Sequence, residues 1–173
     1  VLSDEESVLS SYYGEYCVDT KEAVFTDDVS LENPRFRMLS DTLHYNTDSK
    51  FATIVGPTNI YSGKSEVYSE NGRYNTSARQ AFLLDRSVLY NDNKNVVADS
   101  IFYDTARGSS AVFGHIVYTD TLNRNMLTGE YAFIDEIADS AYVTERAVVV
   151  DFSQKDSLFM HADTIWTVSY NLD

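Results

Sequence analysis

The stretch that decides the fold is Ala98-Asp99-Ser100-Ile101-Phe102-Tyr103-Asp104-Thr105, because it returns along the chain in recognisable copies. Each copy has a small residue, an acid, an apolar or aromatic pair and then usually Asn or Asp. Good copies start at Ser40 and Ser69, looser ones at Gly129 and Ala162, and a shortened one at Gly14. The acids of the five longer copies are Asp41, Glu70, Asp99, Glu130 and Asp163, spaced by 29, 29, 31 and 33 residues. This recurrence indicates tandem structural units.

A second apolar segment follows each copy, after a few polar residues. These segments cover residues 23–31, 52–61, 81–90, 111–118 and 141–150. The intervening turns, such as Asn46-Thr47-Asp48-Ser49 and Asn91-Asp92-Asn93-Lys94, consist of residues that bond their own backbone or tolerate left-handed geometry. Apolar residues do not recur at helical spacing, except weakly between Asp4 and Tyr12, where a short helix is conceivable. The sequence therefore predicts an elongated all-β fold of about 11 antiparallel strands, built from tandem two-strand repeats of roughly 29 residues.

The second segments share an apolar register. Aligned on their apolar centres, they superimpose Val29, Ile60, Val88, Ile116 and Val148. The alignment extends to Phe25, Leu84 and Val112 on one side, and to Leu31, Tyr90, Tyr118 and Val150 on the other. Because side chains alternate along a strand, these residues would form a continuous apolar floor. The floor is either an ordinary core or the lining of a groove for acyl chains, and periodicity does not separate the two.

The recurring acid shares the parity of its apolar neighbours, as Asp41 does with Leu43 and Tyr45. An unpaired acid on an apolar face is costly. We expect a corner acid that accepts backbone N–H groups where the strand begins. A ladder of bound cations is the alternative, although the dense Gly-Asp runs of calcium-binding solenoids are missing from the sequence.

Composition excludes several classes of function. Thirteen Lys and Arg against 27 Asp and Glu give a net charge of −14, which argues against binding nucleic acid or anionic headgroups. The single Cys17 rules out an internal disulfide, and we expect it to be a small buried residue. The chain starts at Val1. We interpret residues 1–173 as one domain, a mature or excised part of a larger exported protein.

The sequence offers no constellation for catalysis, metal or cofactor. His44, His115 and His161 lie in different repeats, without the spacing of zinc ligands. The Gly-x-Ser-x-Gly elbow of hydrolases is missing from the sequence, and nothing selects a facing pair of acids. The sequence therefore predicts a protein that is not an enzyme.

The repeat resembles the LptA/OstA family of lipopolysaccharide export proteins. Three phrases carry the resemblance: Phe25-Thr26-Asp27-Asp28-Val29, Ser100-Ile101-Phe102-Tyr103-Asp104 and Leu127-Thr128-Gly129-Glu130-Tyr131. It extends over nearly the whole chain, from about Tyr12 to Tyr170. The resemblance implies an open, V-shaped β-jellyroll that is periplasmic, works in outer-membrane assembly and carries the acyl chains of lipid A in its apolar interior.

The resemblance also implies site residues and partners. The groove would be lined by Phe25, Val29, Leu31, Ile60, Leu84, Val88, Val112, Ile116, Val148 and Val150. Modules of the LptA/OstA type would join end to end through free edge strands, here near Tyr16 and Val18 and near Trp166 and Val168. The charge of −14 departs from what phosphorylated lipid A requires. Either the acids face away from the groove, or cations bridge, or the cargo differs.

Two other functions remain open. One is a structural or interaction domain of the cell envelope that binds protein partners by edge-strand pairing and has a fully packed interior. The other is an exported carbohydrate-binding module, which predicts aromatic residues clustered on an outer face. Against it, Tyr45, Tyr74 and Tyr103 recur at one repeat position and look structural.

Overall fold

The described residues form one twisted antiparallel sheet of fifteen strands. A computed structural model describes residues 2–3, 8–32, 34, 36–104, 106–135, 137–138 and 140–168, without the side chains of residues 2–3, 91 and 167–168. The strands are β1 (Leu2–Ser3), β2 (Val8–Ser10), β3 (Tyr13–Cys17), β4 (Glu22–Glu32), β5 (Arg37–Asn46), β6 (Phe51–Ser62), β7 (Ser65–Asn75), β8 (Gln80–Leu84), β9 (Ser87–Asn91), β10 (Lys94–Ala98), β11 (Ser100–Asp104), β12 (Ser109–Asp120), β13 (Asn125–Asp135), β14 (Ser140–Asp151) and β15 (Leu158–Val168).

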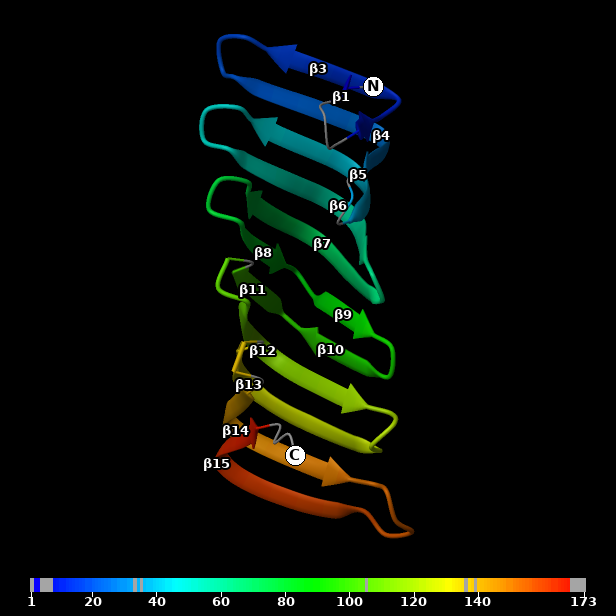
Figure 1. Cartoon of the computed structure of the whole chain (residues 1–173), viewed down its shortest axis with the longest axis vertical. Coiled ribbons are helices and arrows are strands. Elements are labelled where there is room, and N and C mark those ends of the chain that lie inside the picture. Colours follow the sequence, from blue (N-terminus) through cyan, green and yellow to red (C-terminus); the bar gives the residue numbers. More distant parts are fainter. Residues whose placement is uncertain are drawn as a thin grey trace.

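The strands lie as successive tiers along the long axis, with β3 and β15 at opposite ends (Figure 1). Most tiers are one long strand. Three tiers consist of two short strands that pair with the same neighbour: β2 and β3 on β4, β8 and β9 on β7, and β10 and β11 on β12. The fifteen strands therefore make eleven tiers besides the two-residue β1, so the expected all-β fold of about 11 strand positions is confirmed.

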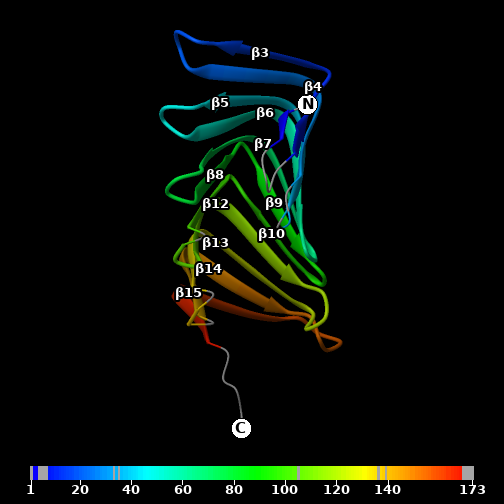
Figure 2. The same cartoon turned by 45° about the horizontal axis from the view of Figure 1, so that its top comes forward.

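Every second tier bends sharply at its centre. The bends are Asp27-Asp28, Gly56-Pro57, Asp85-Arg86, Gly114-His115 and Glu145-Arg146, spaced by 29 residues until the last interval of 31. At least one residue of each pair has a positive φ, between 46° and 88°. Each pair lies opposite a single residue of the neighbouring strand, as Gly56-Pro57 lies opposite Asp41. This is a bulge, and bulges bend strands. Figure 2 shows the long strands turning this corner.

The recurring acids are those single residues. Glu130 is the best-connected: its carboxylate accepts the backbone N–H of His115 at 3.0 Å and a hydrogen bond from the Arg146 guanidinium at 2.8 Å. The expectation of a corner acid that bonds backbone N–H groups is confirmed at this position. Its placement at the start of a strand was wrong, because four of the five acids lie in the middle of a long strand and Asp99 lies between β10 and β11.

The bends divide the sheet into two walls that face each other. Wall A contains residues 13–17, 22–26, 42–46, 51–55, 71–75, 80–84, 100–104, 109–113, 131–135, 140–144 and 164–168; wall B contains residues 8–10, 29–32, 37–40, 58–62, 65–69, 87–91, 94–98, 116–120, 125–129, 147–151 and 158–162. Both walls contribute to each apolar cluster. Phe25 and Leu43 of wall A pack with Val29 and Met38 of wall B, for example.

Small residues line the inside of the corner. The residue after each bend is nearly inaccessible: Val29, Thr58, Ser87, Ile116 and Ala147 are 1%, 0%, 0%, 2% and 1% exposed. A Cβ on Gly129, also at this row, would lie 2.4 Å from a methyl carbon of Val143. The two walls approach closely here, and three of the five positions hold the small or polar residues Thr58, Ser87 and Ala147. This row separates the apolar interior from the solvent behind the corner.

Asn and Asp side chains close the hairpins at the far ends of the walls. Asn46, Asn75, Asp104 and Asp135 each accept backbone N–H groups two and three residues ahead, at 2.8 to 3.1 Å. These are the turns that the repeat predicts. At Asp104, the side-chain hydrogen bond from Gln80 and the turn N–H groups lower the pKa of the carboxyl.

Two local expectations were wrong. The segment proposed as a short helix contains strand β2 at Val8–Ser10, while residues 4–7 lie outside the described residues. Cys17 is exposed rather than buried, at the end of the edge strand β3.

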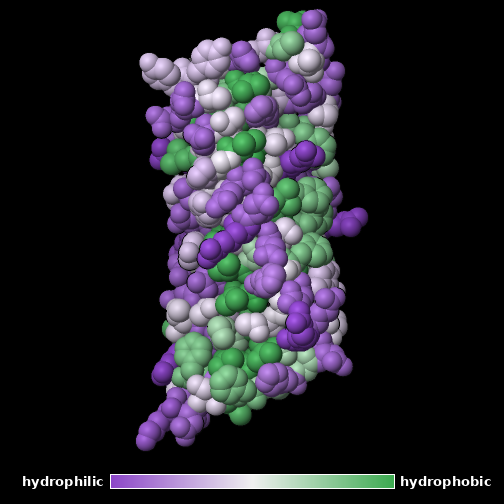
Figure 3. Space-filling model, turned by 180° about the vertical axis from the view of Figure 1, so that it is seen from behind, coloured by the Kyte–Doolittle hydropathy of each residue, from purple (hydrophilic) through white to green (hydrophobic). Residues whose placement is uncertain are grey.

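Seen from behind, the surface mixes hydrophobic and hydrophilic side chains along the whole stack (Figure 3).

Buried hydroxyls at the corner give a stability test. Ser69 donates its hydroxyl to the carbonyl oxygens of Asn71 and Leu84 at 2.7 and 3.0 Å, whereas the Ser87 hydroxyl is the one buried side-chain polar atom without a partner in the described part of the chain. We expect Ser87→Ala to raise the free energy of unfolding by about 1 kcal/mol and Ser69→Ala to lower it by about the same amount, as urea denaturation would measure. A loss of stability in both variants would contradict this assignment.

Candidate functional site: the space between the walls

Apolar side chains from both walls pack against each other and fill the interior between the walls. The larger cluster combines Ile101, Val112 and Val143 of wall A with Val96 and Ile116 of wall B. Partly buried residues, including Leu89, Tyr118 and Val149, extend it toward the ends of the strands. The smaller cluster fills the first tiers in the same way, with Leu31 and Ile60 at its margin. The two clusters therefore give both halves of the stack an interior of the same apolar character.

The structure brings six of the ten expected lining residues into these clusters. Phe25, Val29, Val112 and Ile116 are buried in them, and Leu31 and Ile60 pack at their margins. Leu84, Val88, Val148 and Val150 belong to neither cluster. Each stands next to an inward residue, namely Leu83, Leu89 or Val149, and side chains alternate, so these four are on the opposite face of their strands. Val88 is nevertheless buried there, at 8% exposed. Whether any of the ten contacts a lipid remains a prediction.

The four displaced residues have a common cause. The true repeat row runs through Val29, Thr58, Ser87, Ile116 and Ala147, directly after the bends. Three of these residues are small or polar because the corner is tight. An alignment on apolar centres therefore selects the next large apolar residue. It assigns Val88 to the row in place of Ser87, and Val148 in place of Ala147. A shift of one residue changes the face.

The sequence argument also omitted half of the lining. Wall A contributes Leu43, Ile54, Ile101, Ala132, Val143 and Ile165 to the interior. These residues follow the recurring acid by two positions or belong to its neighbouring strands. The shared face of Leu43 with Tyr45 and of Ile101 with Tyr103 was the available signal. It was not recognised as lining because the fold of each strand back over itself was not foreseen.

The interior is apolar except at the far end of wall B, where the Asp120 carboxylate is only 3% exposed. Tyr118 packs against the larger cluster, and its burial, assisted by the nearby Asp120, raises the pKa of its phenol to about 12. The corner acids Asp41, Glu70, Asp99 and Asp163 are all exposed, outside the bend. Of the three explanations for the acidity, the structure supports acids that face away from the interior. The other polar groups inside are mostly hydroxyls, such as Ser40 and Thr58, which bond each other at 2.8 Å.

One histidine joins the corner acids. His115 Nδ1 lies 2.8 Å from the Asp99 carboxylate on the outside of the bend. The hydrogen bond to Asp99, and then the charges of Asp99 and Glu130, raise the pKa of the imidazole. The contact stabilises the folded state below the unfolded-state pKa of histidine and fades as the pH rises through the raised value. At 82% exposure of the His115 side chain, solvent keeps this effect small.

The sheet presents a free edge at each end. Among the described strands, β15 pairs only with β14, and β3 only with β4. Large apolar side chains are exposed on β15: Leu158, Phe159, Met160 and Trp166 at 69, 61, 51 and 66%. Tyr16, on β3, is 51% exposed. Val18, expected in the edge strand, lies in the turn after β3, and the side chain of Val168 lies outside the described part.

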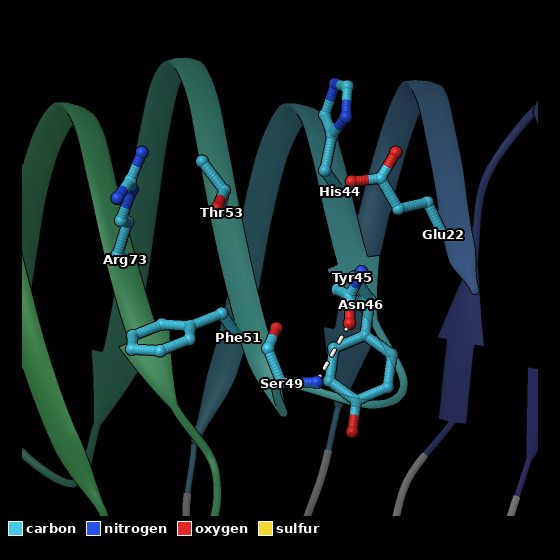
Figure 4. Close-up of a pocket in the computed structure, with 8 residues that line it drawn as sticks. All are labelled: Glu22, His44, Tyr45, Asn46, Ser49, Phe51, Thr53 and Arg73. Carbon is cyan, nitrogen blue, oxygen red and sulfur yellow. Dashed lines mark hydrogen bonds between the residues drawn. The ribbon is translucent and has the colours of Figure 1, made fainter. Parts of the chain in front are cut away.

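Two shallow hollows lie on wall A. The first, of about 230 Å³, is bordered by Glu22, His44, Thr53 and Arg73 from neighbouring strands (Figure 4). His44 stands next to the buried Leu43, so this hollow opens on the outer face. The dashed line in Figure 4 is the turn bond from Ser49 N–H to the Asn46 side chain, at 2.8 Å. The second, of about 310 Å³, is near Phe102 and Phe133.

The described residues hold no group of three or more His, Cys, Asp or Glu placed to bind a metal ion. The expected alternative of a cation ladder therefore lacks support in the described corner. In the same part of the chain, there is no helix with the length and apolar character needed to span a membrane.

The fold and the first tiers are similar to known proteins. The profile of the OstA-like protein family matches residues 1–41. Seventeen solved chains match in structure. One is LptH from Pseudomonas aeruginosa, described as the LptA-homologous periplasmic component of the conserved lipopolysaccharide transport device; its TM-score is 0.52 at 17% identity, over 57% of this chain and 76% of LptH. No curated protein matches in sequence.

These findings show an LptA-like fold whose first 41 residues are similar to the OstA-like family. At 17% identity the structural likeness shows the fold, and the family profile adds the sequence likeness of the first 41 residues. The resemblance expected from the repeat is confirmed.

Proposed function

We propose that the protein is a non-catalytic carrier that takes the acyl chains of lipid A between its two walls and passes lipopolysaccharide across the periplasm to the outer membrane. The observation that carries the proposal is that wall A and wall B cover each other with apolar residues and are joined by backbone only at the corner. The proposal assigns no catalytic residue and no cofactor.

The connection at the corner supports an interior that can open. Each described strand pairs with its neighbours within its own wall, so side chains alone hold the far ends of the walls together. The walls can separate about the bends without breaking the ladders. An acyl chain that enters then packs against the apolar side chains of both walls, and each methylene that leaves water contributes about 0.8 kcal/mol.

The charge distribution supports an apolar cargo with its polar part outside. Apart from the buried Asp120 at the far end of wall B, the lining is apolar or hydroxylic, and the phenol of Tyr118 stays neutral. The exposed corner acids stand behind the bend, away from an acyl chain between the walls.

The free edges support assembly with further modules of the LptA/OstA type. An exposed apolar edge strand is an aggregation hazard unless a partner covers it. Strand β15 lacks Lys and Pro, the residues that usually protect such an edge, and it exposes Phe159 and Met160. A partner strand can extend the sheet there, or along β3, by backbone pairing.

A second function, a structural or interaction domain that binds protein partners by its edges and carries no lipid, is favoured by one observation. The interior is filled by the protein's own side chains, with Val29, Val112 and Ile116 at most 2% exposed. The two candidates differ in whether lipid enters between the walls.

Site-specific photo-crosslinking distinguishes them. We expect a benzoylphenylalanine at Ile60, at the margin of the smaller cluster, to capture lipopolysaccharide, because the residue faces the space between the walls. The control is the same probe at Asn59, the preceding residue on the same strand, which points to the outer face. The readout is the lipopolysaccharide-labelled band on an immunoblot. Equal labelling at the two positions would refute the carrier function and leave the structural one.

The edge partnership has a separate test. We expect Phe159→Lys to abolish the concentration-dependent association of the protein in sedimentation velocity, because a charge on β15 prevents strand addition. Leu122→Lys is the matched control: Leu122 is 73% exposed in the turn between β12 and β13, so its replacement should leave association intact. Association unaffected by Phe159→Lys would exclude β15 as the docking edge.

A further inference from the structure

An aromatic row crosses the outer face of wall A in the second half of the stack. Phe82, Phe102, Phe133, Tyr142 and Trp166 follow one another on β8, β11, β13, β14 and β15, with Ala111 of β12 between the second and third. The ring centroids are 4.7 Å apart for Phe82 and Phe102, 5.8 Å for Phe133 and Tyr142, and 4.6 Å for Tyr142 and Trp166. Tyr131 and Phe113 widen the row at its centre.

The fold does not require these rings. They point away from the buried cluster, since each adjoins an inward residue such as Leu83, Ile101 or Val143. In the first half of the stack, the same row consists of Val24, His44, Thr53 and Arg73. These tiers pair in the same way, and the His44 imidazole is the one ring among the four side chains. Phe82 and Trp166 are 41 and 66% exposed. The rings therefore add cross-strand contacts beyond those that the equivalent tiers of the first half need.

Ala111 opens a hollow in the middle of the row. The hollow, of about 310 Å³, has Phe102 on one side and Phe133 with Tyr131 on the other. Hydrogen-bonding groups border it at the end of the strands, from Asp104, Arg107, Ser109 and Asp135. One oxygen of the Asp135 carboxylate closes the following turn, and its other oxygen has no bond among the described residues.

This combination matches the chemistry of a sugar. The negative face of an aromatic ring attracts the C–H groups on the flat side of a pyranose. Carboxylate and hydroxyl groups at the border can bond the equatorial hydroxyls. A protein with a net charge of −14 repels anionic polymers, which leaves a neutral one. Rings on neighbouring tiers form a straight platform, which suits an extended chain.

We propose that the aromatic row binds a neutral, extended oligosaccharide, with one hexose ring in the hollow over Ala111. The site is separate from the space between the walls and does not depend on lipid binding there. A neutral hexose chain can come from two sources, the saccharide part of a lipopolysaccharide or a free glycan, and the two probes below distinguish them.

Trp166 is the single tryptophan of the chain and belongs to the row, so its fluorescence reports on the site. The full chain is titrated at constant protein concentration with cellohexaose and, separately, with an uncharged polysaccharide released from lipopolysaccharide by mild acid and freed of its charged core sugars. We expect a saturable change with at least one probe. Saturation with cellohexaose supports a free glycan as ligand, and saturation with the polysaccharide alone supports the saccharide of a lipopolysaccharide. No change with either at millimolar concentration would overturn the proposal.

Variants locate the binding. Tyr142→Ala, which removes the ring between Phe133 and Trp166, should raise Kd by about tenfold, whereas Tyr142→Phe should keep it. Ala111→Phe fills the hollow without removing any ring, and it should weaken binding even if Tyr142→Ala fails to fold. Tyr90→Ala, an exposed tyrosine of wall B, is the control and should leave Kd unchanged. Binding that survives both Ala111→Phe and Tyr142→Ala would place the sugar elsewhere and overturn the assignment.

Discussion

The structure depends on a row of left-handed bends at the centre of every second tier. Asp27-Asp28, Asp85-Arg86 and Glu145-Arg146 place two consecutive non-glycine residues at positive φ, which costs about 1 kcal/mol or more for each. Bonds to the facing acids and the burial of both walls offset that cost. At Gly114, where φ is 72°, a Cβ would lie 2.2 Å from an oxygen of the Asp99 carboxylate, so a larger residue would have to displace that side chain. Without these bends the tiers would form an open sheet with no interior.

The bends also determine which size of side chain fits at each position of the interior. The walls converge at the corner, so Thr58, Ser69, Ser87 and Ala98 occupy positions that a flat sheet would give to larger apolar residues. Away from the corner the walls diverge, and Phe25, Met38 and Leu43 fill the wider space. The corner joins the walls by backbone along one line, and side chains alone hold their far ends together.

Much of the fold could be predicted from the sequence. The repeat of Asp41, Glu70 and Asp99 fixed the tier spacing, and the Asn and Asp turns fixed the hairpins. The interior could be predicted only in part, because hydrophobic patterns carry no sign of a bulge. Val88 and Val148 were placed inside in preference to Ser87 and Ala147, since packing at a tight corner favours small residues over apolar ones. The aromatic row escaped notice because its members occupy different repeats and become neighbours only through strand pairing.

The central claim is that the two walls move apart about the bends to admit acyl chains. It is tested most directly by the distance between nitroxide labels at Ser49→Cys and Lys64→Cys, in turns at the far ends of the two walls of β6, in a chain whose Cys17 is replaced by Ser. Double electron–electron resonance measures this distance with and without lipopolysaccharide. We expect the distance to increase when lipopolysaccharide binds. A distance that stays the same at saturating lipopolysaccharide would contradict the claim.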